Sequence, residues 1–188
     1  MKPPRSLLAA VLISLTSLAF AQSDAQKSVA QSDAQKSFDT LKTLAGTWQG
    51  PITVAPPRED VKQGTLGQIT MRVTSRGNAL VHEMQEAGTP LDATKYDHPV
   101  TMIYLDGDRL TLIHYCDAGN RPRMTGKLSP DNKKVEFDFV DLSGGNEYGH
   151  MYHALFTIID ANHHIEDWTY MEPGDKPVHA HMDMVKSN

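Results

Sequence analysis

The sequence contains a single cysteine, Cys116, so no disulfide can form within the chain. It also lacks a basic cluster: the 188 residues carry a formal net charge of -5, which argues against nucleic acid as a partner. There is no nucleophile elbow, phosphate-binding loop, dinucleotide-binding glycine motif, His-Glu-x-x-His run or pair of zinc-binding cysteines. These absences remove the usual sequence signatures of catalysis and leave the fold to be inferred from patterning.

The longest apolar run lies at the N-terminus and is short. Lys2 and Arg5 precede the apolar stretch from Leu7 to Leu18, and Ala19-Phe20-Ala21 fits a cleavage site before Gln22. This stretch is too short to span a membrane comfortably. We therefore expect residues 1–21 to be a signal peptide, and the mature protein to be periplasmic or extracellular with no stable membrane span.

A polar repeat follows the predicted signal peptide. The segment Gln-Ser-Asp-Ala-Gln-Lys-Ser occurs twice, at residues 22–28 and 31–37. It has no bulky apolar side chain to bury, which predicts a linker over residues 22–37. The remaining residues, 38–188, have the length of one domain. Apolar residues at Phe38, Leu41 and Leu44 predict a short helix that ends at Gly46.

The rest of the chain is a series of short β-type runs separated by turn signals. Asp106-Gly107, for example, predicts a type I′ hairpin turn between two apolar runs. No helical pattern long enough for a crossover intervenes, so neighbouring strands are expected to pair antiparallel and to close on themselves. The predicted strands are residues 46–54, 66–75, 79–87, 99–105, 109–116, 123–129, 134–141, 150–159, 164–171 and 178–186. The prediction is an all-β, up-and-down meander that closes into a roughly ten-stranded barrel.

A short helix leading into Gly46-Thr47-Trp48 near the start of an all-β chain resembles the opening motif of the calycin superfamily. That group includes lipocalins, fatty-acid-binding proteins and nitrobindin-like haem barrels. The segments 111–116 and 119–124 look like secreted bacterial lipocalin-like proteins of unknown function. The resemblance implies a closed barrel with an interior cavity, ten strands being nearer the fatty-acid-binding and nitrobindin type. It also implies that Trp48 closes one end of the barrel.

Strand alternation selects the residues expected to face the interior. Successive side chains point to opposite faces, and the apolar face must be buried. His114 would then share the inner face with Leu112, and Glu166 would share it with Trp168. Apolar residues would supply contact area for a ligand, while polar ones would orient it. The predicted ligand-binding residues are Tyr104, Leu112, His114, Cys116, Met124, Phe137, Phe139, Glu166, Trp168 and Tyr170.

Nine histidines raise the question of a metal. His179 and His181 are two apart on one predicted strand, so they share a face, which Asp183 extends. A solvated outer face is the alternative for this row. His114 and Cys116 form a second candidate, joined across strands by His153, Glu166 or His82, with haem or a transition metal as the group bound. The alternative is that His114 hydrogen-bonds in a polar cavity and Cys116 packs as a small apolar residue.

Three functions remain open at this stage. The first is a carrier of a small hydrophobic or amphipathic molecule, which needs no cofactor. The second is a haem- or metal-binding barrel that uses histidine. The third is a small isomerase or hydrolase in which His114 and Glu166 act as acid and base. The sequence favours the first, and it leaves the ligand and the oligomeric state undefined.

Overall fold

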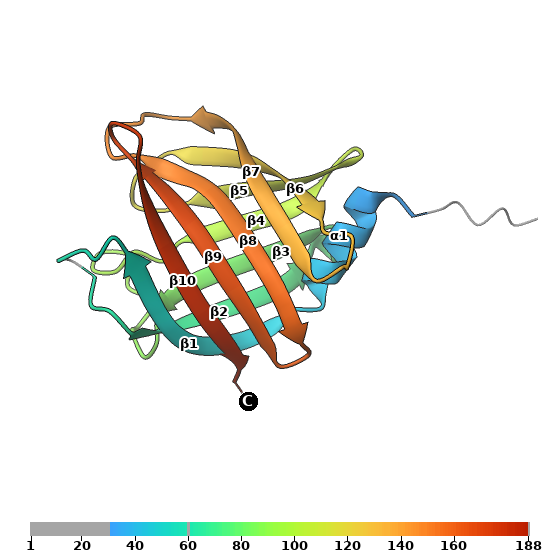
Figure 1. Ribbon diagram of the computed structural model, residues 1–188, viewed down its shortest axis with the longest axis horizontal. Helices are drawn as coiled ribbons and strands as arrows, with labels where there is room; N and C mark the ends of the chain where they lie inside the picture. The colour runs from blue at the N-terminus through green and yellow to red at the C-terminus, as the bar shows by residue number, and fades with distance from the viewer. Residues whose placement is uncertain (1–30, 60, 188) are drawn as a thin grey trace, which may run out of the picture. The chain divides into compact units, whose positions relative to one another are not determined.

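The computed structural model describes residues 31–59 and 61–187, and over this range the chain forms a closed antiparallel barrel (Figure 1). This confirms the predicted fold class. The barrel follows one short helix, α1 (Asp33–Lys42). The ten strands are β1 (Gly46–Ala55), β2 (Thr65–Thr74), β3 (Ala79–Glu86), β4 (Val100–Asp106), β5 (Arg109–Tyr115), β6 (Arg121–Leu128), β7 (Lys134–Ser143), β8 (His150–Asp160), β9 (His163–Glu172) and β10 (Lys176–Lys186).

Each strand pairs with its neighbours in sequence, and β1 pairs with β10 to close the barrel. The loops therefore alternate between two ends. The helix α1 packs on β4, β5 and β6 at the end where the turns are short, on the right of Figure 1. We call this the closed end. The longer connections, residues 56–64, 87–99, 116–120 and 144–149, gather at the opposite, open end.

The helix begins earlier than the sequence predicts. We expected a linker up to residue 37, but α1 starts at Asp33, so the second copy of the repeat forms its first turns. The side chain of Ser32 caps the helix by accepting a hydrogen bond from the backbone N–H of Gln35. Phe38 and Leu41 are buried, and they anchor these polar turns. The predicted signal peptide and the first repeat copy lie outside the described residues.

The strand boundaries agree with the prediction to within about two residues, but one turn differs in type. Asp106 pairs with Arg109, so the two-residue loop is Gly107-Asp108 rather than Asp106-Gly107. Gly107 has a φ of 64°, whereas Asp108 is not among the residues with positive φ. Glycine at the first loop position is typical of a type II′ turn, not of the type I′ turn that we predicted.

The closed half of the barrel is filled by side chains. Trp48, Leu112, Met124, Phe137 and Phe156 all belong to one buried cluster, together with Phe38 and Leu41 of α1. Among the described residues, the space left inside the barrel therefore lies toward the open end. Within the part of the chain that the structure describes, no helix has the length and apolar character needed to cross a membrane.

Candidate functional site

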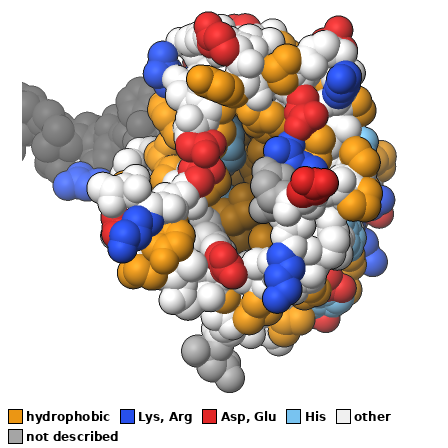
Figure 2. All heavy atoms as spheres, turned by 90° about the vertical axis from the view of Figure 1, so that its left-hand side faces the viewer, with side chains coloured by type: hydrophobic (Ala, Val, Ile, Leu, Met, Phe, Trp, Pro, Cys, Tyr) orange, Lys and Arg blue, Asp and Glu red, His pale blue; other side chains and the backbone are white. Residues whose placement is uncertain are grey.

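A cavity of about 780 Å³ opens at the end of the barrel opposite α1. Figure 2 looks into this end and shows a hollow with hydrophobic side chains inside it and charged side chains around its rim. We call it the central cavity. The apolar residues that line it are Val54, Val61, Met84, Pro99, Ala118, Met151, Trp168, Pro173, Val178 and Ala180. A second pocket, of about 580 Å³, lies between α1 and β5–β6, and neither a histidine nor an aromatic residue lines it.

Trp168 and His114 form the floor of the central cavity. Their rings lie 5.7 Å apart between centroids, and both side chains are nearly inaccessible to solvent. Strands β9 and β5 place them there, because Trp168 lies near the middle of β9 and His114 lies one residue before the end of β5, both on the inner face. The floor thus combines a large apolar surface with one imidazole.

The imidazole of His114 is held by a neighbouring strand. Thr101 is paired with His114 in the β4–β5 register, and the Thr101 hydroxyl lies 2.9 Å from Nδ1 of His114. The other ring nitrogen, Nε2, has no hydrogen-bond partner among the described residues. Burial, and secondarily the charge of His82, lower the pKa of His114 to about 3. The cavity floor therefore presents a neutral imidazole with one ring nitrogen available to a ligand.

The neutral state of His114 predicts acid-sensitive stability. Below its ordinary pKa of 6.5 the unfolded chain takes up a proton that the folded protein excludes. The free energy of unfolding is thus fully retained above pH 6.5 and falls toward pH 3 by about 1.4 kcal/mol per pH unit. Between pH 7 and pH 5, urea unfolding should show a loss about 2 kcal/mol larger in the wild type than in His114→Asn, which keeps a group facing Thr101. Equal losses in the two proteins would contradict this assignment.

Beneath Trp168 lies a buried carboxylate with three donors. Glu166 accepts a hydrogen bond from Nε1 of Trp168 at 2.9 Å, and its oxygens lie 3.0 Å from Nε2 of His82 and of His164. Burial acts to raise the pKa of Glu166, but the charge of His82 and hydrogen bonds from His164 and His82 outweigh burial and lower it below its usual range. Glu166 is therefore ionised, and it fixes the orientation of the Trp168 indole.

This network crosses the interior of the barrel. His82 lies on β3 and Glu166 on β9, and these strands are not neighbours in the sheet. On its other side, His164 packs edge-on against Trp48 at 4.3 Å between ring centroids. Nδ1 of His82 and Nδ1 of His164 are buried and have no hydrogen-bond partner within residues 31–59 and 61–187. The network thus connects Trp168 on the cavity floor to Trp48 at the closed end. Glu166, at its centre, does not line the cavity.

The Cys116 thiol and the Tyr170 hydroxyl, which line the cavity above its floor, both have raised pKa values. Burial raises the pKa of the Cys116 thiol, and the carboxylates of Asp97 and Asp117 raise it further. Burial also raises the pKa of Tyr170, followed by the influence of Cys116 and Asp117. Neither side chain is ionised near neutral pH, so both offer only neutral polar contacts to a ligand.

The structure divides the predicted ligand-binding residues by depth. His114, Cys116, Trp168 and Tyr170 line the central cavity. The others on the inner face, which are Leu112, Met124, Phe137 and Glu166, are fully buried below it. Residues that we did not predict also line the cavity, among them Met84, Asp97 and Asp117. Thr101 was missed as well, although counting back from the β4–β5 turn pairs it with His114.

Tyr104 and Phe139 do not line the central cavity. Thr101 and Ile103 are the buried residues of β4, so Tyr104 alternates to the opposite, outer face. Phe139 is half-buried and packs against the rings of His150 and Tyr152. Phe139 still pairs with Met124, and the register of β6 and β7 shifts only beyond it, before Asp141 pairs with Arg123.

The histidines predicted as a weak metal site lie on the outside of the barrel. His179 and His181 are both exposed on β10. Nδ1 of His179 lies 3.0 Å from the hydroxyl of Thr169, and Nδ1 of His181 lies 2.7 Å from Asp167 on β9. They pair with separate neighbours across the strand rather than with each other. His179 and His181 therefore fit the alternative that we considered, a solvated outer face, better than they fit a metal site.

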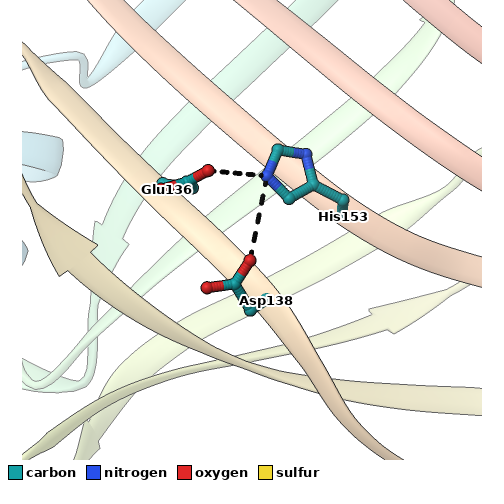
Figure 3. Close-up of side chains that lie close together, drawn as sticks. All are labelled: Glu136, Asp138 and His153. Atoms are coloured by element: carbon teal, nitrogen blue, oxygen red, sulfur yellow. Dashed lines mark hydrogen bonds and ion pairs between the residues drawn. The ribbon is translucent and has the colours of Figure 1, made fainter.

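Among residues 31–59 and 61–187, one group of His, Asp and Glu side chains has ligand atoms close enough together to hold a metal ion. On the outer face of β7 and β8, Nε2 of His153 lies 3.2 Å from Glu136 and 4.0 Å from Asp138 (Figure 3). However, the ammonium of Lys127 lies 3.3 Å from Glu136 and 3.1 Å from Asp138. A metal ion would have to compete with this cation for both carboxylates. We therefore interpret the cluster as an ion-pair network on the barrel wall.

Comparisons with known proteins give a fold but no family. No family of known proteins and no curated protein matches the chain. Among solved structures, Rv2717c from M. tuberculosis is similar with a TM-score of 0.58 at 11% identity, covering 81% of this chain and 98% of that one. A protein of unknown function from the DUF3598 family of Nostoc punctiforme PCC 73102 is similar with a TM-score of 0.54 at 9% identity. That match covers 78% of this chain and 48% of the Nostoc chain. At these identities the likeness shows the barrel fold alone.

Proposed function

We propose that this protein is a calycin-type barrel that binds a small, mainly apolar molecule in its central cavity. The observation that carries the proposal is the cavity itself, which is large enough for a small ligand and lined mainly by apolar side chains. Its floor adds one neutral imidazole with an available ring nitrogen. Such a site binds mainly through apolar contact area and offers polar groups both at its floor and at its mouth.

The proposal also includes export, with action in the periplasm or outside the cell. This rests on the charged and apolar pattern of residues 1–21 and on the site that follows Ala21. An intact mass that begins at Gln22 in protein recovered from its source would support it. A mass that includes Met1 would oppose it.

Filling the cavity tests the binding function. Ala180 lines the cavity and is paired with Trp168, so Ala180→Phe should occupy the space above the floor. We expect this change to weaken binding of the neutral fluorescent probe N-phenyl-1-naphthylamine by about tenfold or more, since each 1.4 kcal/mol of lost contact corresponds to a factor of ten. Fluorescence titration measures the affinity.

The matched control is Val185→Phe, which adds a ring at an exposed position of the same strand. It should bind the probe as the wild type does. If Ala180→Phe also binds like the wild type, the probe lies elsewhere and the cavity proposal fails. Native mass spectrometry of protein from its own host would then identify any molecule that copurifies.

Haem or metal binding is the second candidate, and it rests on the same imidazole. Nε2 of His114 faces the cavity in a neutral ring, as an axial ligand requires. The cavity fits haem poorly, because Asp97 and Asp117 line it and would repel the two anionic haem propionates. An absorbance band in the Soret region that is lost in His114→Asn would favour this candidate over an organic ligand.

A further inference from the structure

The mouth of the central cavity carries more negative than positive charge. Asp97, Asp117 and Glu172 line it, and Arg58 is the one lysine or arginine among the described residues that lines it with them. Arg58 forms an ion pair with Glu172, which leaves little net charge on that pair. Asp97 and Asp117 therefore determine the sign of the electrostatic potential at the entrance.

The influence of these carboxylates extends into the cavity. Both Asp97 and Asp117 contribute, after burial, to the raised pKa of the Cys116 thiol. Asp117 also contributes to the raised pKa of Tyr170. A cleft with apolar walls concentrates such a field, because little solvent lies between the charge and the ligand. A ligand at the height of Cys116 thus experiences a negative potential.

The floor offers no compensating positive charge. The pKa of about 3 keeps His114 neutral at physiological pH. Among the described residues, no lysine and no arginine other than Arg58 lines the cavity. A carboxylate on a ligand would therefore lose its water near two acidic side chains without gaining an ion pair.

We propose that the central cavity selects neutral or cationic amphiphiles over carboxylates such as fatty acids. The apolar part of the ligand lies on Met84, Met151 and Trp168, and an amine or hydroxyl group remains near Asp97 and Asp117 at the mouth. This inference rests on the proposed ligand-binding function and specifies the chemical class that the site accepts.

A matched series of ligands tests the selectivity. Dodecylamine, dodecanol and dodecanoate share one chain length and differ in head group, and each is titrated below its micelle concentration against bound N-phenyl-1-naphthylamine. At low salt and pH 7.4 we expect the amine and the alcohol to displace the probe at concentrations about fivefold or more below those needed for dodecanoate. The advantage of the amine over the alcohol should shrink as salt screens the exposed carboxylates.

Two double variants assign the effect to the mouth. Asp97→Asn with Asp117→Asn should remove the advantage of the amine over the alcohol and bring dodecanoate within about twofold of the alcohol. Asp106→Asn with Asp108→Asn makes the same change in charge at the closed end, so it should leave the order of the three ligands as in the wild type.

The possible failures are distinguishable. If the probe does not bind the wild type, or binds it independently of Ala180→Phe, then the ligand-binding function itself is wrong. If the probe binds in the cavity but dodecanoate competes as well as the amine, then the cavity stands and the selectivity is wrong. The selectivity is equally overturned if both double variants behave alike.

Discussion

Replacing Glu166 with glutamine should lower the free energy of unfolding by about 3–5 kcal/mol. Three donors, on His82, His164 and Trp168, converge on the two oxygens of this fully buried carboxylate. Glutamine would remove the charge that these groups face, and would turn an NH₂ group toward at least one of the donors. Urea unfolding followed by tryptophan fluorescence measures the loss.

The same chemical change on the outside of the barrel provides the control. Glu136 pairs with Lys127 and His153 on the exposed wall, where ion pairs contribute little. Glu136→Gln should therefore cost less than about 1 kcal/mol. A Glu166→Gln protein as stable as Glu136→Gln would show that the interior network does not hold the barrel together.

Truncating Trp48 to alanine should also cost about 3–5 kcal/mol. Trp48 is fully buried, donates from Nε1 to the backbone oxygen of Leu44 at 2.7 Å, and supports the ring of His164. Alanine would leave a cavity at the closed end and an unpaired buried carbonyl. Thermal and urea unfolding should both report the loss, which is a large part of the stability of an ordinary domain.

Two comparisons separate the contributions of Trp48. Trp48→Phe retains most of the apolar volume but not the hydrogen bond, so it should lose clearly less stability than Trp48→Ala. Tyr152→Ala, at an exposed aromatic on the barrel wall, should change the free energy of unfolding by no more than about 1 kcal/mol. If Trp48→Ala were as mild as Tyr152→Ala, Trp48 would not be closing the barrel.

Alternation predicts which face of the sheet a residue occupies, and the prediction is confirmed for β5 and β9. The inner faces assigned to β5 and β9, with Leu112 and His114 on one and Glu166 and Trp168 on the other, are the buried faces in the structure. Alternation is informative because the side chains on one face of each strand are buried when the barrel folds, whereas those on the other face can remain in solvent. The turn signals then limit each strand to within about two residues.

Alternation does not predict height along the barrel axis. Leu112 and His114 share a face, yet only His114 lines the cavity, because the side chains nearer α1 fill the barrel. Height depends on strand tilt and on the packing of distant strands, which no local pattern encodes. Phe139 shows a second limit, since its ring packs against His150 and Tyr152 instead of lining the cavity, which the alternation of its own strand does not predict.

The polar contacts across the barrel interior could not be predicted from the pattern of any single strand. His82 and Glu166 are separated by 84 positions in the chain, and they meet only because the barrel closes. The sequence predicted a few polar groups in a largely apolar interior, but not which histidine would reach which carboxylate. The mouth acids Asp97 and Asp117 lie in connecting loops, where strand periodicity gives no information.

The pairing of β1 with β10 has a consequence for how the chain folds. Every other pairing joins strands that are adjacent in sequence, so these can form as local hairpins while the chain is still incomplete. The β1–β10 seam closes nearly the whole domain as one loop, and it must wait for the last strand. Until then the free edges of β1 and β9 can pair with other chains. A chain that ends before β10 should therefore aggregate or be degraded, because both edges of its sheet stay unpaired until the final strand joins them.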